Sequence, residues 1–203
     1  MSKIIISCFY TKDTPYEQEF YRFLKPSLDK LGLTYTVDVM QSAGSWYKNV
    51  AMKPHTLLRA LERYPDYNVV GIDVDAEITQ NPTLLYEIPE EYDIACHFLN
   101  WKEWYGHDVD IEELLSGTIF LRNNKKVKEM CQQWYNMAMG VQEWEQKCLE
   151  RLIKQNSDIK VYKLPIDYTY IATLPDGSSP RVKVPNPIVI HHQASRRLKK
   201  RIL

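Results

Sequence analysis

Short aliphatic runs alternate with amphipathic segments along the first part of the chain. Residues 3–7 (Lys-Ile-Ile-Ile-Ser) predict a buried strand, because three consecutive isoleucines stand between polar residues. A helix is predicted to begin at Thr14, which can cap it, with Pro15 at the first helical position. Apolar residues then recur at helical spacing as far as Gly32, and Pro26 predicts a kink.

The same alternation of strand and helix continues up to residue 72. Residues 33–39 alternate apolar and polar side chains and predict a second strand. A helix is predicted over residues 54–63, and the run Asn-Val-Val-Gly-Ile at 68–72 predicts a third strand. This order predicts a single-domain α/β fold with a mostly parallel central sheet and helices on both faces.

The second half of the chain is less regular. The predicted strands span residues 93–96, 117–121, 159–164 and 188–191, and the predicted helices span 127–140 and 144–153. Residues 165–187 are rich in Pro, Asp, Gly and Ser and predict a long loop. Residues 195–203 are strongly basic, so we expect one domain over 1–194 followed by a basic C-terminal tail.

Composition and charge exclude several classes of protein. The 26 basic residues balance the 26 acidic ones, which disfavours a nucleic-acid binder guided by overall charge. No apolar run approaches the ~18 residues of a transmembrane segment, and the apolar start of the chain is too short for a signal peptide. The four cysteines are widely separated and fit buried thiols in a reducing compartment, so we expect a cytoplasmic protein.

The most informative motif is an aliphatic strand that runs into Asp73-Val74-Asp75. Open α/β sheets bind ligands at the carboxyl edge of their strands, which is where these carboxylates are expected. In an extended backbone, Asp73 and Asp75 face the same way and can bind one Mn²⁺ or Mg²⁺ ion. The alternative is a turn after the strand, where Asp is common because of its local hydrogen bonds.

Two further groups of residues could complete a ligand site at this edge. Gly117 stands between small hydroxyl residues at a predicted strand start, where a ligand can approach the backbone; the alternative is a β-bulge without a ligand. Glu145 and Gln146 begin a predicted helix and can hydrogen-bond the hydroxyl groups of a sugar. Their alternative is a solvated helix face.

Basic residues supply the remaining candidates. His191 and His192 end the last predicted strand, and a neutral imidazole can complete a metal site that holds two carboxylates. Because neighbouring residues of a strand point to opposite faces, we expect one ligand and favour His191; the alternative is two hydrogen-bonded structural histidines. Lys53 precedes the helix that leads to the Asp-x-Asp strand and can neutralise a diphosphate, unless it is simply solvated.

The order of these features resembles the GT-A-fold glycosyltransferases that use nucleotide-diphosphosugars. The resemblance extends from Ile4 to about Lys200 and is most specific at residues 70–75 (Val-Gly-Ile-Asp-Val-Asp) and 116–123 (Ser-Gly-Thr-Ile-Phe-Leu-Arg-Asn). It implies a metal-dependent transfer of a sugar from a nucleotide-diphosphosugar to an acceptor hydroxyl of unknown identity. A UDP-sugar is the donor that we expect.

The resemblance also implies roles for individual residues. A divalent ion would be held by Asp73, Asp75 and a histidine, and Tyr10 and Thr11 would lie near the base and ribose. The donor would also contact Lys53.

On the acceptor side, the resemblance implies that Glu145, beside Gln146, orients the acceptor hydroxyl or takes its proton. The family usually has Asp where this chain has Glu145. A Lys-Pro-Trp stretch common in the family is replaced here by Ser-Arg-Arg-Leu-Lys at 195–199, which makes Arg196 a candidate for the diphosphate contact. Ser116 and Gly117 complete the candidate donor site.

Three other interpretations are compatible with parts of the sequence. A phosphatase or phosphotransferase can use Asp-x-Asp with its first Asp as the nucleophile, but the haloacid-dehalogenase-like motif normally lies on the first strand and has Thr or Val where this chain has Glu77. A non-catalytic nucleotide-sugar binder needs nearly the same residues as the enzyme. The basic tail could bind an anionic lipid surface or nucleic acid.

Overall fold

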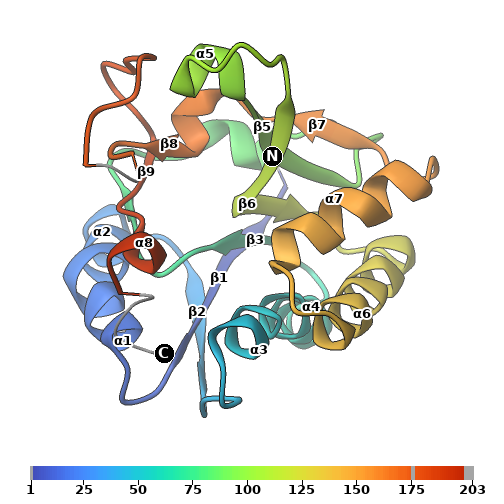
Figure 1. Cartoon of the computed structure of the whole chain (residues 1–203). Helices are drawn as coiled ribbons and strands as arrows, with labels where there is room; N and C mark the ends of the chain where they lie inside the picture. The colour runs from blue at the N-terminus through green and yellow to red at the C-terminus, as the bar shows by residue number, and fades with distance from the viewer. Residues whose placement is uncertain (1, 175–176, 199–203) are drawn as a thin grey trace.

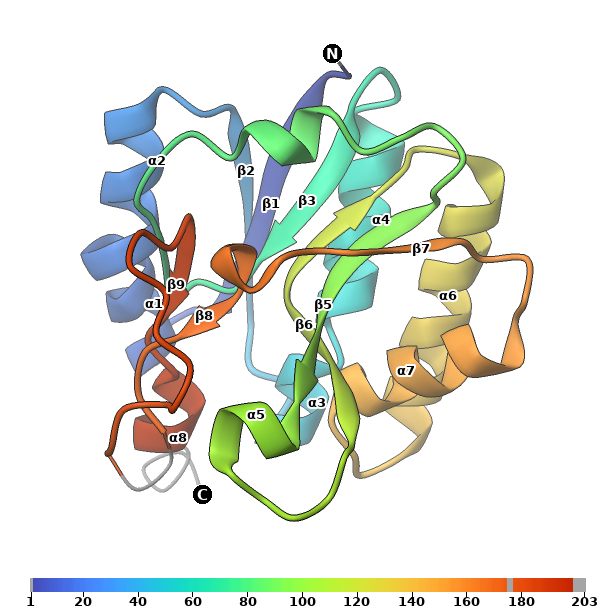
Figure 2. The ribbon, with the colours of Figure 1, turned by 90° about the horizontal axis from the view of Figure 1, so that it is seen from above.

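A six-stranded central sheet lies between two helical layers (Figures 1 and 2). This computed structural model describes residues 2–174 and 177–198. The strands follow the order β2 (Tyr35–Met40), β1 (Ile4–Thr11), β3 (Asn68–Ile72), β6 (Glu112–Leu121), β5 (Ile94–Asn100) and β7 (Val161–Lys163). Among these six, β6 runs antiparallel to both of its neighbours, whereas the other three pairings are parallel. The predicted α/β fold with a mostly parallel sheet is confirmed.

Neighbouring residues of the strands face different helical layers, because side chains alternate along a strand. Ile5 and Val69 pack on one side against the second-half helices and α4. Ile6 and Val70 pack on the other side against the N-terminal helices. The first layer contains α4 (Lys53–Arg63), α6 (Lys125–Gly140) and α7 (Glu145–Gln155); the second contains α1 (Pro15–Glu19) and α2 (Lys25–Leu31).

The first helix is continuous but changes its hydrogen-bond pattern just before Pro26. Between α1 and α2, residues Phe20–Leu24 form a π-helical segment, and the Lys25 amide donates to the Phe20 carbonyl. Pro26 has no amide hydrogen to donate. The wider π-helical turn before it lets the helix continue where the sequence predicts a kink. Thr14 holds the predicted N-cap position, but its side chain makes no cap hydrogen bond: its hydroxyl donates to the Thr11 carbonyl at 2.7 Å.

The predicted loop at 165–187 contributes to a second, smaller sheet. Its strands follow the order β4 (Ala76–Ile78), β9 (Val189–His191) and β8 (Tyr170–Ile171). The shorter helices are α3 (Trp46–Val50), α5 (Trp101–Tyr105) and α8 (Ala194–Leu198), and the 3₁₀ segments are Thr83–Tyr86 and Ile166–Tyr168. The small sheet brings β9 and the residues directly after it beside the carboxyl edge of β3.

The basic C-terminal segment is described only in part. Its first residues belong to α8, and residues 199–203 lie outside the described residues. The boundary between domain and tail therefore stays a prediction. Within residues 2–174 and 177–198, no helix has both the length and the apolar character needed to cross a membrane.

Candidate active site

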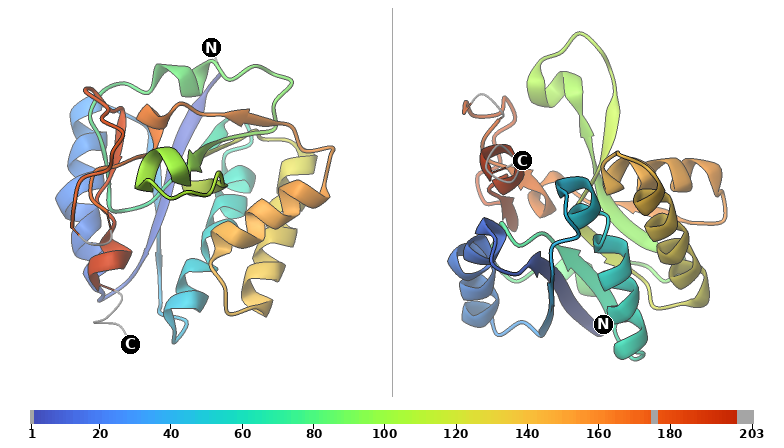
Figure 3. Two further views of the ribbon diagram at one scale, coloured as in Figure 1. Left: turned by 45° about the horizontal axis from the view of Figure 1, so that its top comes forward. Right: turned by 60° about the horizontal axis from the view of Figure 1, so that its bottom comes forward.

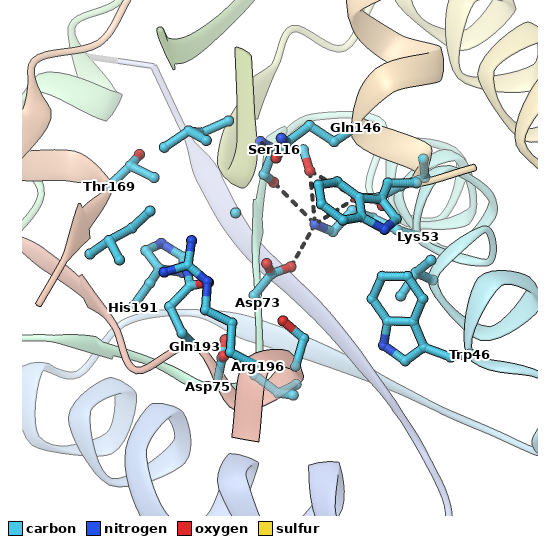
Figure 4. Close-up of a pocket in the computed structure, with 18 of the residues that line it drawn as sticks. Trp46, Lys53, Asp73, Asp75, Ser116, Gln146, Thr169, His191, Gln193 and Arg196 are labelled. Carbon is cyan, nitrogen blue, oxygen red and sulfur yellow. Dashed lines mark hydrogen bonds and ion pairs between the residues drawn. The ribbon is translucent and has the colours of Figure 1, made fainter. Parts of the chain in front are cut away.

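A cavity of about 890 Å³ opens where β1 and β3 end (Figure 4). Its lining comes from both sheets and from helices α1, α3, α4, α5, α7 and α8. The residues predicted from the sequence that line it are Tyr10, Thr11, Lys53, Asp73, Asp75, Ser116, Gly117, Glu145, Gln146, His191 and Arg196. The structure thus brings together in one cavity every predicted site residue except His192.

The Asp-x-Asp motif is a turn rather than an extended segment. The Ala76 amide donates to the Asp73 carbonyl at 3.0 Å, so the expectation of an extended backbone was wrong. The turn still leaves the two carboxylates close together. The pairing of β9 with β4 then places His191 beside them. One ligand atom each from Asp73, Asp75 and His191 lies within 4.8 Å of the others.

The chemistry of this cluster fits a divalent cation. His191 is buried, and burial lowers the pKa of its imidazole to about 4, so the ring is neutral near pH 7. Its Nε2 lies 3.0 Å from the Thr118 hydroxyl, which leaves Nδ1 as the nitrogen for a metal. Asp75 is fixed by the Ala194 amide, which donates to Oδ2 at 2.6 Å. Two carboxylates and one neutral imidazole suit Mn²⁺. The carboxylate oxygens also suit Mg²⁺, which prefers oxygen to nitrogen ligands.

Gly117 makes room for this cluster. A Cβ atom on Gly117 would lie 2.8 Å from His191 Cε1 and 3.3 Å from Asp73 Oδ2. The predicted strand start was wrong, because Gly117 lies inside the ten-residue strand β6. Residues 116–118 fall at a register shift against β5, and the Gly117 carbonyl accepts the Asp73 amide at 2.9 Å. The close approach expected of a ligand is therefore made by protein side chains.

His192 directly follows β9, and its ring lies apart from the cluster. Its ring stacks on Phe23 with the ring centroids 3.9 Å apart, and its Nε2 lies 3.2 Å from Glu77 Oε2. The two neighbouring histidines therefore have different surroundings, and the choice of His191 as the metal ligand stays a prediction.

Lys53 is a buried centre of positive charge rather than a solvated lysine. Its ammonium lies 2.6 Å from Asp73 Oδ1 and 3.3 Å from Glu145 Oε1, and it donates to the Ser116 carbonyl at 3.2 Å. Burial opposes the charge, but the carboxylates of Asp73 and Glu145 outweigh it and raise the pKa of Lys53 above its ordinary value. Lys53 thus connects the Asp-x-Asp turn to the beginning of α7 (Figure 4).

Glu145 and Gln146 are held against β6 by Ser116. The Ser116 hydroxyl donates to Glu145 Oε1 at 2.8 Å, and the Ser116 amide donates to Gln146 Oε1 at 3.1 Å. Gln146 Nε2 donates in turn to Glu113 Oε1 at 3.1 Å. Glu145 is only 7% exposed, so the alternative of a solvated helix face is wrong for this residue.

The remaining predicted residues lie along the rim and far wall of the cavity. Tyr10 is buried beside Phe20, and burial raises the pKa of its phenol to about 12. Thr11 ends β1 and is also buried. Arg196 is half-buried on α8, and its guanidinium donates to the Tyr105 hydroxyl at 3.3 Å.

Sequence reasoning missed the aromatic part of the lining and one acid, Glu113. The missed aromatic residues include Tyr16, Trp46, Trp101, Tyr105 and Trp144. They come from separate short helices and helix starts, so no local pattern connects them. Trp144 directly precedes Glu145, and this adjacency was the available signal.

Comparison with known families decides the class of this protein. A model of the nucleotide-diphospho-sugar transferase family matches residues 16–202. The chain belongs to this family. It is therefore a glycosyltransferase, and the resemblance found in the sequence is confirmed at the level of family and fold.

Solved glycosyltransferases have the same fold as this transferase at low sequence identity. One, involved in glycosylation of the major capsid of PBCV-1, has a TM-score of 0.67 and 13% identity, over 100% of this chain and 99% of that one. Apo GlyE of Streptococcus pneumoniae TIGR4 has a TM-score of 0.61 and 14% identity, over 95% of this chain and 55% of that one. Mouse xyloside xylosyltransferase 1 has a TM-score of 0.57 and 10% identity, over 96% and 98%. A search of curated proteins found no match.

Proposed function

We propose that the transferase moves a sugar from a nucleotide-diphosphosugar, preferably a UDP-sugar, to an acceptor hydroxyl with Mn²⁺ or Mg²⁺ bound. Asp73, Asp75 and His191 would hold the ion. The observation that carries this proposal is their convergence within 4.8 Å at the cavity. When bound, a divalent ion supplies positive charge beside the diphosphate, where negative charge develops as the sugar leaves.

The contacts of Lys53 support a different role from the direct diphosphate contact expected from the sequence. Its ammonium is already engaged by Asp73, Glu145 and Ser116, and its side chain is 9% exposed. We propose that Lys53 positions Asp73 and Glu145 relative to each other. Arg196 lines the cavity with a partly exposed side chain, so it is our candidate for the diphosphate contact.

Glu145 is our candidate for the residue that orients the acceptor hydroxyl or takes its proton. Ser116 and Lys53 fix its carboxylate, and its position in the lining gives it access to a bound acceptor. Gln146 would hold a hydroxyl of the donor or the acceptor from the same helix start. Tyr10 and Thr11, at the end of β1, are the candidates for the base and ribose.

The cysteines support the expectation of a cytoplasmic location. Cys8, Cys96, Cys131 and Cys148 are all buried free thiols. Buried unpaired cysteines fit a reducing compartment.

The proposed function is tested by supplying donors to the purified protein with and without Mn²⁺. The donors are UDP-glucose, UDP-galactose, UDP-N-acetylglucosamine, UDP-xylose and GDP-mannose, and the readout is release of free nucleoside diphosphate. We expect one UDP-sugar to be turned over and the reaction to stop when Mn²⁺ and Mg²⁺ are removed by EDTA. Turnover that persists in EDTA would contradict the metal assignment, and absence of turnover or binding for every donor would contradict the donor assignment.

A further inference from the structure

The cavity has an aromatic side at the start of α7. Trp144 is 43% exposed there and lies perpendicular to Trp46, with 6.4 Å between the ring centroids. Trp46 is in turn fixed by its indole N–H, which donates to the Tyr16 hydroxyl at 3.1 Å. A large apolar ring is thus presented next to Glu145 rather than packed into the core.

A second aromatic side comes from α5, which stands away from the central sheet at the end of β5 (Figure 3). Trp101 and Tyr105 are perpendicular to each other, with 6.2 Å between ring centroids, and both line the cavity. The Trp101 indole N–H donates to Glu113 Oε2 at 2.8 Å, which fixes the orientation of the ring. Two aromatic surfaces on separate elements therefore border one cavity.

Polar groups connect these two sides. Glu113 accepts from Trp101 with one oxygen and from Gln146 with the other, and Gln146 is bound to Ser116 beside Glu145. Carboxylate and amide groups thus run from α5 to the proposed catalytic acid.

Thr169 adds an unmatched hydroxyl to the lining. Its side chain is 2% exposed, and Oγ1 has no hydrogen-bond partner among the described residues. Figure 4 shows Thr169 on the opposite side of the cavity from Trp46. Because Oγ1 is closed to solvent, this hydroxyl is costly to the fold but is not part of the surface offered to a ligand.

Aromatic faces combined with carboxylates and amides match the surface of a sugar ring. A pyranose has C–H groups that pack on an aromatic face and hydroxyl groups that bond to carboxylates and amides. An alkyl chain would present no hydroxyl groups to this polar part of the lining, and a peptide hydroxyl would present no ring to the indoles. We propose, on the basis of the proposed function, that the acceptor is a saccharide bound between Trp144 and Trp101.

The transfer itself is a substitution at the anomeric carbon of the donor. The acceptor oxygen bonds to that carbon, the bond from the carbon to the diphosphate oxygen breaks, and the nucleoside diphosphate leaves with the electron pair. The hydroxyl proton passes to Glu145 and then to solvent. No oxidant or reductant is needed.

The test supplies the five donors named above with Mn²⁺ and adds glucose, galactose, xylose, lactose or maltose, a Ser/Thr peptide, or octanol. We expect a saccharide to accelerate nucleoside diphosphate release over hydrolysis by water, and the peptide and octanol to have no effect. Trp144→Ala and Trp101→Ala should each raise the acceptor KM about fivefold to tenfold. Trp144→Phe and Trp101→Phe should recover most of the affinity.

Tyr135→Ala is the matched control, because Tyr135 is a half-buried aromatic on α6 that packs on His55 outside the cavity lining. Its acceptor KM should equal that of the wild type. Three outcomes with intact donor hydrolysis would overturn the acceptor proposal and leave the proposed function standing. They are no acceleration by any saccharide, acceleration by the peptide or octanol alone, and an unchanged acceptor KM in both alanine variants. Absence of donor turnover and binding in the wild type would instead contradict the proposed function, and the acceptor proposal with it.

Discussion

Two buried aspartates beside the same sheet differ in how their charge is satisfied. Asp75 follows β3 at the cavity and is 9% exposed; Asp93 precedes β5 and is 5% exposed. The carboxylate of Asp93 accepts from Lys126 Nζ at 2.8 Å, the Lys160 amide at 2.9 Å and Asn124 Nδ2 at 3.0 Å. Lys126 thus neutralises the charge of the Asp93 carboxylate, and the three donors together satisfy its hydrogen bonds within the fold.

The pKa values of the two carboxyl groups shift in opposite directions. Burial raises the pKa of Asp75 above its ordinary value, and the hydrogen bond from the Ala194 amide opposes this only in part. At Asp93, burial also acts to raise the pKa, but the bonds from Lys126, Lys160 and Asn124 outweigh it and lower the pKa. Similar burial thus gives a structural carboxylate in one place and, in the other, a carboxylate suited to an added cation.

The largest expected effect comes from removing the charge of Asp75. Asp75→Asn keeps an oxygen for the Ala194 amide, so the fold should persist, while a ligand of the proposed metal site is lost. We expect Mn²⁺-dependent affinity for UDP to fall at least about 100-fold in calorimetry. Thermal stability without metal should stay the same or rise, because an uncompensated buried charge is removed. Binding close to that of the wild type would contradict the account.

The same substitution at Asp93 should have the opposite profile. Asp93→Asn should reduce the free energy of unfolding by about 2 kcal/mol near neutral pH, since buried donors lose a charged acceptor, and should leave UDP affinity unchanged. Because the pKa of Asp93 is lowered by folding, its contribution is complete above about pH 4 and is lost as the pH falls through the lowered value. Urea denaturation should therefore show a smaller difference in the free energy of unfolding between Asp93→Asn and the wild type at pH 3 than at pH 7.

Within the cavity, Glu145 separates catalysis from binding. Glu145→Gln should keep donor affinity nearly unchanged but lower the transfer rate at saturating donor by at least about tenfold, because general-base assistance is worth roughly 100- to 10,000-fold. The control is Glu143→Gln, whose carboxylate is 40% exposed and pairs with Arg151 at 2.6 Å. The transfer rate of Glu143→Gln should stay within about a factor of two of the wild-type rate. Equal rates for the two variants would remove Glu145 from the mechanism.

The smallest expected effect is that of His192. His192→Ala removes a ring that stacks on Phe23, so Mn²⁺ affinity should change by less than about twofold. His191→Ala should lower it by more than about tenfold, since a proposed ligand is lost. Equal losses in the two variants would contradict a site with one histidine ligand.

Local patterns were sufficient to predict the strands of the central sheet, and together with the family resemblance they named most of the candidate residues that line the cavity. The strand at 68–72 and the helix near 54–63 each bury a continuous apolar face, so their side-chain periodicity is visible in the sequence. The sequence also named His191 as a partner of Asp73, but the strand pairing that brings them together lies in the small sheet.

The small sheet and the environment of Lys53 could not be predicted from local patterns. β4 and β8 are three and two residues long, and both depend on pairing with β9. The burial of Lys53 depends on Ser116 and Glu145, which lie on two distant elements. In both cases the stabilising partner is remote in the chain, so no sequence window contains the signal.

The central claim is that Asp73, Asp75 and His191 bind one divalent ion. Pulsed electron paramagnetic resonance of Mn²⁺ bound to the protein with UDP detects a directly coordinated nitrogen through its nuclear coupling. We predict a nitrogen coupling in the wild type that persists in His192→Ala and disappears in His191→Ala. A wild-type spectrum without nitrogen coupling, or the same coupling in both variants, would contradict this metal site.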